Sequence, residues 1–263
     1  MIISSPQEAQ IQVRFFEDIY KSKIEKLPFL RDVDIDHGRK VLNTEAECDK
    51  YIALYGGHHF HKLYAAFPST NFQYTEGKSV EIIDWGCGQA LATCVLIDYL
   101  IEKRISPRIE SITLIEPSSI ALCRGYSFVR QILQPAFSNN SLIQTVNKYI
   151  DNLNSSDFVS SSSNIKIHLF SNILDVEAFD LTKLYQLIIN NFEGFNRIIC
   201  ISPYHNAKNY RIDTFYNLFN QYPRVKKSFY SDEAISQEIF YDNTGKFQIR
   251  EIKRYERQFS IKL

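Results

Sequence analysis

The chain has 263 residues, of which 44% are hydrophobic and 23% charged, a balance that is ordinary for a globular protein with one sizeable core. Its 30 basic and 30 acidic side chains cancel, so no global field draws it to nucleic acid or membrane. No apolar run approaches the roughly 18 residues that span a bilayer, and no secretory signal opens the sequence. The five cysteines are scattered without a CxxC pair, which argues against a metal site. We therefore expect a cytoplasmic protein with free thiols and no membrane or metal partner.

The first 78 residues predict a helical extension that caps the rest of the chain. Apolar residues recur at helical spacing over residues 7–27. A second helix begins with a capping-box-like start at residues 43–44, and the glycines at residues 56–57 are expected to break it. A third helix is expected over residues 58–67, ahead of a proline.

From residue 80 the pattern changes to strands alternating with helices. Four apolar, strand-like runs precede helical patterns: residues 80–84, 111–117, 165–170 and 197–202. Such alternation predicts a parallel sheet covered on both faces. The tail, residues 237–263, has an Asn-Thr-Gly turn between strand-like runs and predicts an antiparallel hairpin at the sheet edge. Residues 79–263 are therefore expected to form a doubly wound, mostly parallel, seven-stranded α/β domain, with residues 1–78 as its cap. A Ser/Asn-rich segment, residues 152–164, is expected to be a mobile surface loop.

The first apolar run ends in a turn suited to a ligand. Asp84 closes the run, Gly86 and Gly88 follow, and a helical pattern begins near Ala90. Ligands of doubly wound sheets bind at the carboxyl ends of the strands, and glycines let the backbone approach a ligand closely. A dinucleotide site needs a third glycine at position 91, where the chain has leucine, so a nicotinamide-dependent oxidoreductase is disfavoured.

This turn resembles motif I, D/E-x-G-x-G-x-G, of the class I S-adenosylmethionine-dependent methyltransferases, with Ala90 in place of the last glycine. The resemblance implies that S-adenosyl-L-methionine is the cofactor. Asp84 would help to hold its cationic amino-acid end, and the turn around Cys87 would admit its methionine portion. The family expects an acid at the end of the next strand to bind the ribose hydroxyls. Glu116, followed by Pro117, stands at that point.

A third position comes after the next predicted strand, residues 165–170. The resemblance implies an acid or amide there for the adenine amino group and an apolar neighbour for the ring. Asn172 fits the first role and Ile173 the second. Asp175 is an alternative to Asn172, unless it caps the following helix.

The fourth predicted strand, residues 197–202, is expected to end beside the sulfonium of the cofactor. The candidate catalytic residues are therefore Ser202, Tyr204 and His205, in a partial match to the [N/D/S]-P-P-[Y/F] motif of amino-methylating enzymes. Tyr204 would stack on a planar substrate and His205 would accept a proton. The alternative is that Ser202 only ends a strand and His205 lies on the surface.

A histidine-rich segment precedes the sheet. His58, His59 and His61 do not match H-E-x-x-H spacing, so a metal site is not expected. Two interpretations remain open: a lid in which Tyr55, Gly57 and the first two histidines approach the cofactor, or an aromatic helix packed on the domain.

Basic clusters occur around residues 103–108, 224–227 and 250–257. With nearby tyrosines they would suit RNA, although interspersed acids favour solvated faces. Taken with the resemblance, the sequence predicts a methyltransferase acting on an unidentified acceptor, an RNA or a small molecule. The alternative is a catalytically inactive, cofactor-binding sensor or interaction module.

Overall fold

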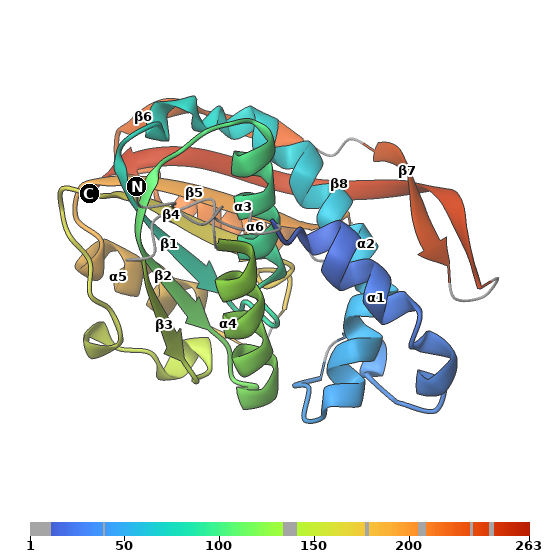
Figure 1. The fold of residues 1–263 in the computed structure, drawn as a ribbon. Helices are drawn as coiled ribbons and strands as arrows, with labels where there is room; N and C mark the ends of the chain where they lie inside the picture. Colours follow the sequence, from blue (N-terminus) through green and yellow to red (C-terminus); the bar gives the residue numbers. More distant parts are fainter. Residues whose placement is uncertain are drawn as a thin grey trace, which may run out of the picture.

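A central β-sheet with helices on both faces forms the body of the protein (Figure 1). The computed structural model describes residues 12–38, 40–133, 141–176, 179–204, 209–231, 234–241 and 245–263. The strands are β1 (Ser79–Trp85), β2 (Arg108–Ile115), β3 (Leu142–Val146), β4 (Ile165–Ser171), β5 (Phe195–Pro203), β6 (Arg224–Ser231), β7 (Ala234–Tyr241) and β8 (Lys246–Lys262).

The strand order is β3-β2-β1-β4-β5-β8-β6, and β7 pairs with β8 beside this path. Strands β1 to β5 run parallel, whereas β8 is antiparallel to β5, β6 and β7. The chain moves outward from β1 through β2 to β3, and then returns to β4 on the other side of β1. The doubly wound, mostly parallel sheet predicted from the sequence is thus confirmed, and its order reverses between β1 and β4.

Strand β3 is absent from the elements predicted from the sequence. It has five residues, of which Val146 alone is buried, so its apolar pattern is short and weak. With β3 counted, the run at residues 165–170 is the fourth strand and the run at residues 197–202 is the fifth. Site positions that the family resemblance assigns to the third and fourth strands therefore apply to β3 and β4, and not to β4 and β5.

The predicted antiparallel hairpin is present, but its second strand does not lie at the sheet edge. Strand β8 has 17 residues. Its first half pairs with β7 in a projecting hairpin, and its second half lies between β5 and β6 (Figure 1). Burial on both faces accounts for this position: Phe259 and Ile261 are buried on one face, and Gln258 and Ser260, which alternate with them, are buried on the other. Gln258 is satisfied there, since its amide donates to the Ala66 carbonyl (2.8 Å).

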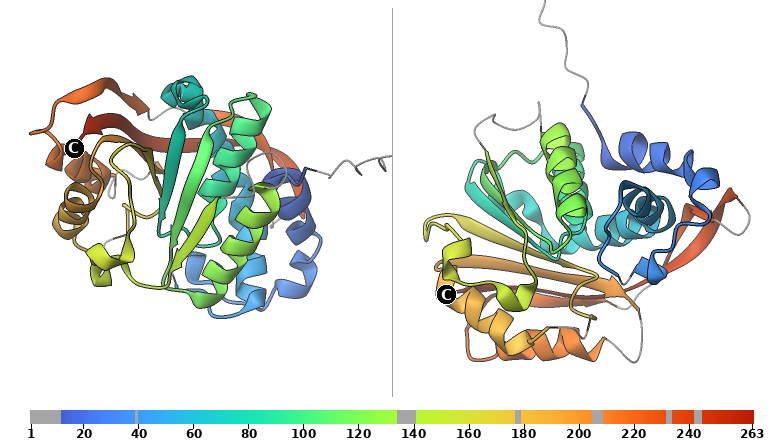
Figure 2. Two further views of the ribbon diagram at one scale, coloured as in Figure 1. Left: turned by 60° about the vertical axis from the view of Figure 1, so that its left-hand side comes forward. Right: turned by 90° about the horizontal axis from the view of Figure 1, so that it is seen from below.

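Helices cover the sheet in two layers (Figure 2). One layer contains α2 (Glu45–Ala66), α3 (Leu91–Glu102) and α4 (Ser119–Leu133), and the other contains α5 (Leu181–Asn191) and α6 (Tyr210–Leu218). Strand β1 is apolar on both faces for this reason: Ile82 belongs to the core under the first layer and Ile83 to the core under the second. Two-sided burial is what a run of consecutive apolar residues predicts.

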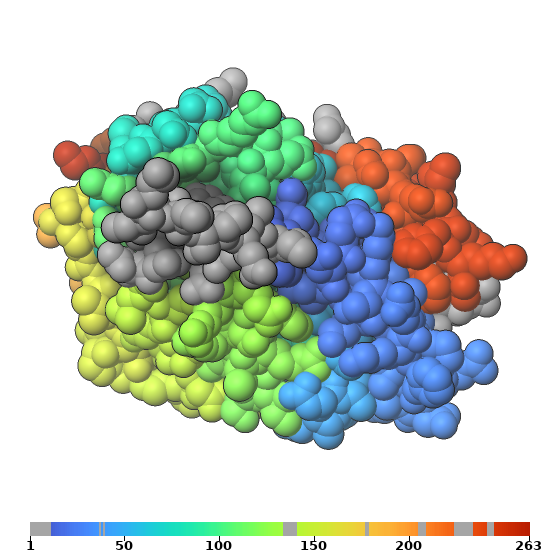
Figure 3. Space-filling view, in the orientation of Figure 1, coloured from blue at the N-terminus to red at the C-terminus, as the bar shows by residue number. Residues whose placement is uncertain are grey.

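The N-terminal part is helical, as predicted. A π-helical turn η1 (Phe15–Tyr20) continues into α1 (Lys21–Ile24), and Thr44 caps α2 in a capping box with Glu47. The remaining short helical turns are η2 (Leu27–Leu30), η3 (Asp36–Gly38), η4 (Phe67–Thr70), η5 (Phe72–Thr75), η6 (Ile150–Asn152) and η7 (Ser155–Asp157). In the space-filling view, this N-terminal part (blue) adjoins the β7–β8 hairpin (orange to red) (Figure 3).

The predicted break at Gly56 and Gly57 is wrong, because α2 runs through both glycines without interruption. Their role is close packing against Tyr20. A Cβ at Gly56 would lie 2.8 Å from Tyr20 Cδ2, and one at Gly57 would lie 2.6 Å from the Tyr20 hydroxyl. The glycines therefore let a buried tyrosine press onto the helix, and tertiary packing outweighs their low helix propensity.

The serine-rich loop is tied to the sheet through Glu81 of β1. One Glu81 oxygen accepts from the Ser161 amide and the Asn164 side chain, both at 2.8 Å, and the other accepts from the Ser160 hydroxyl at 2.6 Å. These bonds satisfy a carboxylate that is 5% exposed. No helix within the described ranges is long and apolar enough to cross a membrane.

Candidate functional site

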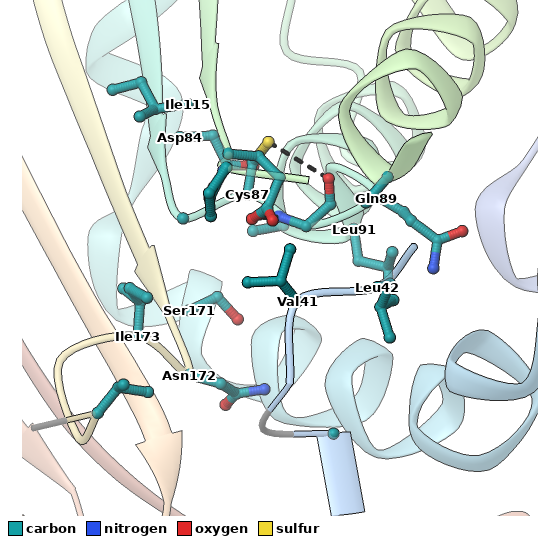
Figure 4. A pocket seen from close by; sticks show the side chains of 18 of the residues that line it. Val41, Leu42, Asp84, Cys87, Gln89, Leu91, Ile115, Ser171, Asn172 and Ile173 are labelled. Atoms are coloured by element: carbon teal, nitrogen blue, oxygen red, sulfur yellow. Dashed lines mark hydrogen bonds between the residues drawn. The ribbon is translucent and has the colours of Figure 1, made fainter. Parts of the chain in front are cut away.

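A cavity of about 990 Å³ opens at the carboxyl ends of β1, β2 and β4, and it is bounded by α2, by Gly38 and by residues 40–42. Figure 4 shows Asp84 and Cys87 on one side of this cavity, Ser171 to Ile173 on another, and Val41 between them. All eight candidate cofactor residues line it: Asp84, Gly86, Cys87, Gly88, Glu116, Pro117, Asn172 and Ile173. The cavity lies where the strand order reverses, the usual ligand position of such sheets.

The turn after β1 needs left-handed backbone at three alternate residues. Gly86, Gly88 and Ala90 have φ values of 61°, 53° and 57°. A Cβ at Gly86 would lie 2.6 Å from Ile173 Cδ1, whereas a Cβ at Gly88 would meet nothing within 4 Å. Gly86 therefore serves packing against the β4 loop, and Gly88 leaves a bare stretch of backbone beside the cavity.

Ala90 replaces the last glycine of the motif at the start of α3. Its methyl group is accommodated by a glycine on the neighbouring helix, because a Cβ at Gly125 would lie 3.0 Å from Ala90 Cβ and 2.9 Å from the Gln89 carbonyl carbon. The substitution is thus matched within the chain, and it leaves the open space at Gly88 unchanged.

Asp84 is buried at the floor of the cavity. It is 1% exposed, and one carboxylate oxygen accepts from the Thr93 amide (3.2 Å) and the Thr93 hydroxyl (2.7 Å). Burial raises the pKa of Asp84 to about 7, with a smaller contribution from the nearby Glu116, against the lowering effect of Thr93. The two hydrogen bonds from Thr93 therefore do not offset the cost of burying the ionised carboxylate.

Glu116 follows β2 and faces the same cavity. Its two carboxylate oxygens accept from the Gly88 amide and the Ser118 amide, each at 3.0 Å, which fixes the side chain beside the glycine turn. Burial raises its pKa, and these two amides oppose the shift. No ion pair joins Asp84 or Glu116 to any residue that the structure describes.

Asn172 lies at the end of β4, the strand that pairs directly with β1. Its side-chain oxygen accepts from Lys62 Nζ at 2.5 Å, and its nitrogen lies 2.6 Å from His59 Nε2. The amide is thus bonded to α2. Since β4 is the fourth strand, the placement of Asn172 and Ile173 after a third strand is wrong, although both line the cavity.

The loop that does follow the third strand was missed together with β3. Lys148, Tyr149, Ile150 and Asp151 line the cavity beside Glu116. The segment is held to the β2 end by Asn147, whose amide donates to the Glu116 and Pro117 carbonyls (2.9 and 2.8 Å). The available signal was the sequence Leu-Ile-Gln-Thr-Val after polar turn residues, a weak strand pattern.

Two of the candidate catalytic residues, Ser202 and Tyr204, are described, and they lie at the end of β5. Ser202 is 1% exposed and donates to Asp175 Oδ1 (2.9 Å), and Tyr204 is 37% exposed with its ring 6.1 Å from that of Tyr255. Neither lines the cavity, and Pro203 of this segment does. His205 lies outside the described residues. The reason is the strand count: β4 lies between β1 and β5, so the end of β5 is one strand further from the glycine turn.

The cap helix contributes a face to the cavity that matches the lid interpretation only in part. Tyr51, Tyr55 and His59, spaced four residues apart on α2, line the cavity. Gly57 and His58 do not line it, and His61 packs against Phe16 and Phe60 elsewhere. The periodicity of the helix explains the difference, because positions four apart share one face.

The basic clusters are largely ion-paired where their side chains are described. Lys103 pairs with Glu102, Arg254 with Glu256 and Arg257 with Asp213. The side chains of residues 224–227 lie outside the described set. Among the described residues, no three His, Cys, Asp or Glu side chains are grouped so as to hold a metal ion.

Comparisons with solved structures give matches of low sequence identity. No protein-family model matches the chain, and no curated protein matches it. The chain is similar to a precorrin-8W decarboxylase from Methanobacterium thermoautotrophicum (10% identity, 76% of this chain and 89% of that chain, TM-score 0.45). It is also similar to an S-adenosylmethionine-dependent methyltransferase from Leishmania major (10% identity, 93% and 85%, TM-score 0.44). A third match is a tRNA (m1A58) methyltransferase from Aquifex aeolicus (8% identity, 78% and 69%, TM-score 0.43).

Proposed function

We propose that the chain binds S-adenosyl-L-methionine in the cavity at the ends of β1, β2 and β4 and uses it to methylate an acceptor. One observation carries the proposal. Two carboxylates, the buried Asp84 and the part-buried Glu116, flank the open backbone at Gly88, and neither has a cationic partner among the described residues. Burial raises the pKa of both groups, so a cationic ligand would stabilise their ionised forms.

The residues present fit the cofactor. The ligand carries a methyl group on a positively charged sulfur and an ammonium group on its amino-acid end. Asp84 would hold the amino-acid end directly or through water, and the space at Gly88 would admit the methionine portion. Glu116, kept in place by two backbone amides, has lone pairs left for the ribose hydroxyls.

With β3 counted, the adenine end belongs to the loop after that strand. Asp151 and the buried Ile150 line the cavity there and offer the acid and the apolar surface that the family resemblance leads us to expect. Asn172 and Ile173 then lie next to the glycine turn, on the side of α2. Alignment of the acceptor with the methyl group would supply most of the rate enhancement.

Isothermal titration calorimetry on the folded chain tests the proposal. We expect S-adenosylmethionine and S-adenosylhomocysteine to bind, and NAD not to bind. Glu116→Gln should weaken binding by about 1–3 kcal/mol, because a hydrogen bond to a charged group is lost. Glu110→Gln is the matched control, since Glu110 lies on the same strand, is exposed and bonds to Ser79.

If neither S-adenosylmethionine nor S-adenosylhomocysteine gives a heat of binding, the proposal is refuted. If they bind, transfer of labelled methyl from S-adenosylmethionine to RNA or small-molecule fractions distinguishes an enzyme from a binding module. Binding without transfer to either fraction supports the inactive sensor or interaction module instead.

A further inference from the structure

The face of α2 that lines the cavity is aromatic and polar at once. Tyr51 and Tyr55 have ring centroids 5.2 Å apart, and the Tyr51 and His59 rings are 5.7 Å apart. Gly38 packs onto both tyrosines, because a Cβ there would lie 3.0 Å from Tyr51 Cε2 and 3.1 Å from Tyr55 Cε2. The two rings are therefore held in place as part of the cavity wall.

The polar groups on this wall have defined hydrogen-bonding roles. Lys62 Nζ donates to the Asn172 side-chain oxygen at 2.5 Å, which leaves the Asn172 nitrogen facing His59. The amide nitrogen can only donate, so a ring nitrogen of His59 accepts from it. The Tyr51 hydroxyl is 3.3 Å from His59 Nε2 and completes a polar edge made of Tyr51, His59 and Asn172.

The charges around this edge keep His59 neutral. Burial lowers its pKa well below the usual range, and the nearby Lys62 and His58 act in the same direction. Burial also lowers the pKa of Lys62 to about 7, against an opposing effect of Asp175. The edge therefore offers neutral hydrogen-bonding groups to a ligand, with no exposed charge of its own.

The cavity lining disfavours a polyanion. Its charged residues are Lys40, Asp84, Glu116, Lys148, Asp151 and Asp175. The two lysines are each paired with a carboxylate, Lys40 with Glu47 at 2.7 Å and Lys148 with Asp157 at 2.6 Å. Among the described lining residues the carboxylates outnumber the lysines, and both lysines are ion-paired. A phosphate backbone would therefore find no unpaired positive charge among these described residues.

We propose that the α2 face formed by Tyr51, Tyr55 and His59, together with Asn172, binds a small, neutral, planar molecule through one hydroxyl or N–H group, and that this molecule is the methyl acceptor. The last clause rests on the proposed function. The rings of Tyr51 and Tyr55, which contact each other at 5.2 Å, pack against one side of the ligand, and the polar edge holds the group that bears the nucleophile.

The test compares phenol with toluene, which has the same shape but lacks the hydroxyl. Each is titrated into chain saturated with S-adenosylhomocysteine and also into ligand-free chain, with binding followed by the methyl resonances of isoleucine. We expect the Ile173 methyl signal to shift and the Ile249 signal to stay unchanged, because Ile173 lines the cavity and Ile249 is an exposed residue of the β7–β8 hairpin. Phenol should bind about fivefold more tightly than toluene, the effect of one net hydrogen bond.

Variants assign this preference to the polar edge. His59→Phe and Tyr51→Phe keep the rings and should each reduce the preference for phenol to below about twofold. His58→Phe is the matched control, since His58 is on the same helix but does not line the cavity, and it should keep the full preference. Should His59→Phe fail to fold, Tyr51→Phe carries the test, because it removes a single oxygen.

The outcomes separate this inference from the proposed function. Equal binding of phenol and toluene to the unaltered chain, or an unchanged preference in both edge variants, overturns the inference even if S-adenosylhomocysteine binds. Phenol binding without any S-adenosylhomocysteine binding supports the site and overturns only its assignment to a methyl acceptor. A hexauridylate RNA that shifts Ile173 where phenol does not would overturn the small-molecule assignment.

Discussion

Gly86 and Gly88 have the same backbone conformation but different surroundings. Alanine substitutions at the two positions therefore distinguish the cost of a left-handed backbone from the cost of a steric clash. An alanine at either φ value costs about 1–2 kcal/mol for left-handed backbone, partly offset by about 0.4–1 kcal/mol because the unfolded chain loses freedom. Gly88→Ala should therefore destabilise the fold by about 1 kcal/mol. Its methyl group enters open space, as Ala90 shows that this turn accepts a Cβ at positive φ.

Gly86→Ala adds a steric term, because its Cβ would lie 2.6 Å from two Ile173 side-chain atoms. Forcing a methyl group into a packed contact costs about 1–3 kcal/mol, so the total loss should be about 2–4 kcal/mol. Ile173→Ala removes the two colliding atoms. In a double-mutant cycle it should restore about 1–2 kcal/mol to Gly86→Ala and be additive with Gly88→Ala to within about 0.5 kcal/mol.

Urea unfolding followed by tryptophan fluorescence measures these differences, since Trp85 is the only tryptophan, is fully buried and stacks on Phe170. Calorimetry with S-adenosylhomocysteine adds a second readout. Gly88→Ala should reduce the free energy of binding by more than it reduces the free energy of unfolding. Equal free energies of unfolding for the two alanine variants, or no coupling between Gly86→Ala and Ile173→Ala, would refute the packing role given to Gly86.

Three further changes test other parts of the structure by the same unfolding assay. Gly57→Ala should destabilise the fold by about 1–3 kcal/mol through its 2.6 Å approach to the Tyr20 hydroxyl, and by less in a Tyr20→Phe background. Gly125→Ala should cost a similar amount, since its Cβ would lie 3.0 Å from Ala90 Cβ, and Ala90→Gly should recover part of the loss. Burial raises the pKa of Asp84 from 3.8 to about 7. Between about pH 4 and pH 7 the folded chain therefore keeps a proton that the unfolded chain releases. The free energy of unfolding should fall as the pH rises through this range. Asp84→Asn should remove this loss, and parallel pH dependence of both proteins would contradict the assignment.

The strand–turn–helix unit around Asp84 was predictable because the signal is local. A two-sided apolar run, a glycine turn and a helix pattern follow one another within about 25 residues, and the structure has each in the expected place. The doubly wound sheet followed from repeating this pattern along the chain. Glu116 was found by the same reasoning, because one helix and one strand separate it from the turn.

The rest depended on packing that no local pattern records. Strand β3 gains its place from pairing along β2, with little apolar signal of its own. Because it was omitted, the run at residues 165–170 was counted as the third strand and the run at residues 197–202 as the fourth. Similarly, the helix-breaking tendency of Gly57 was outweighed by Tyr20, a residue 37 positions earlier in the chain. Contacts between distant segments thus decide both the strand count and the course of α2.

Burial shifts the pKa values of the ionisable groups on the two sides of the cavity in opposite directions. On the sheet side, burial raises the pKa of Asp84 to about 7, which favours the neutral acid; on the helix side, burial lowers the pKa of Lys62 to about 7, which favours the neutral amine. Lys62 reaches the cavity only through Asn172, so the helix side meets a ligand as an amide and an imidazole. A cationic ligand end is therefore stabilised at the sheet and not at the helix. Under the proposed function, this asymmetry would orient a cationic cofactor toward β1 and leave the α2 face for a neutral second ligand.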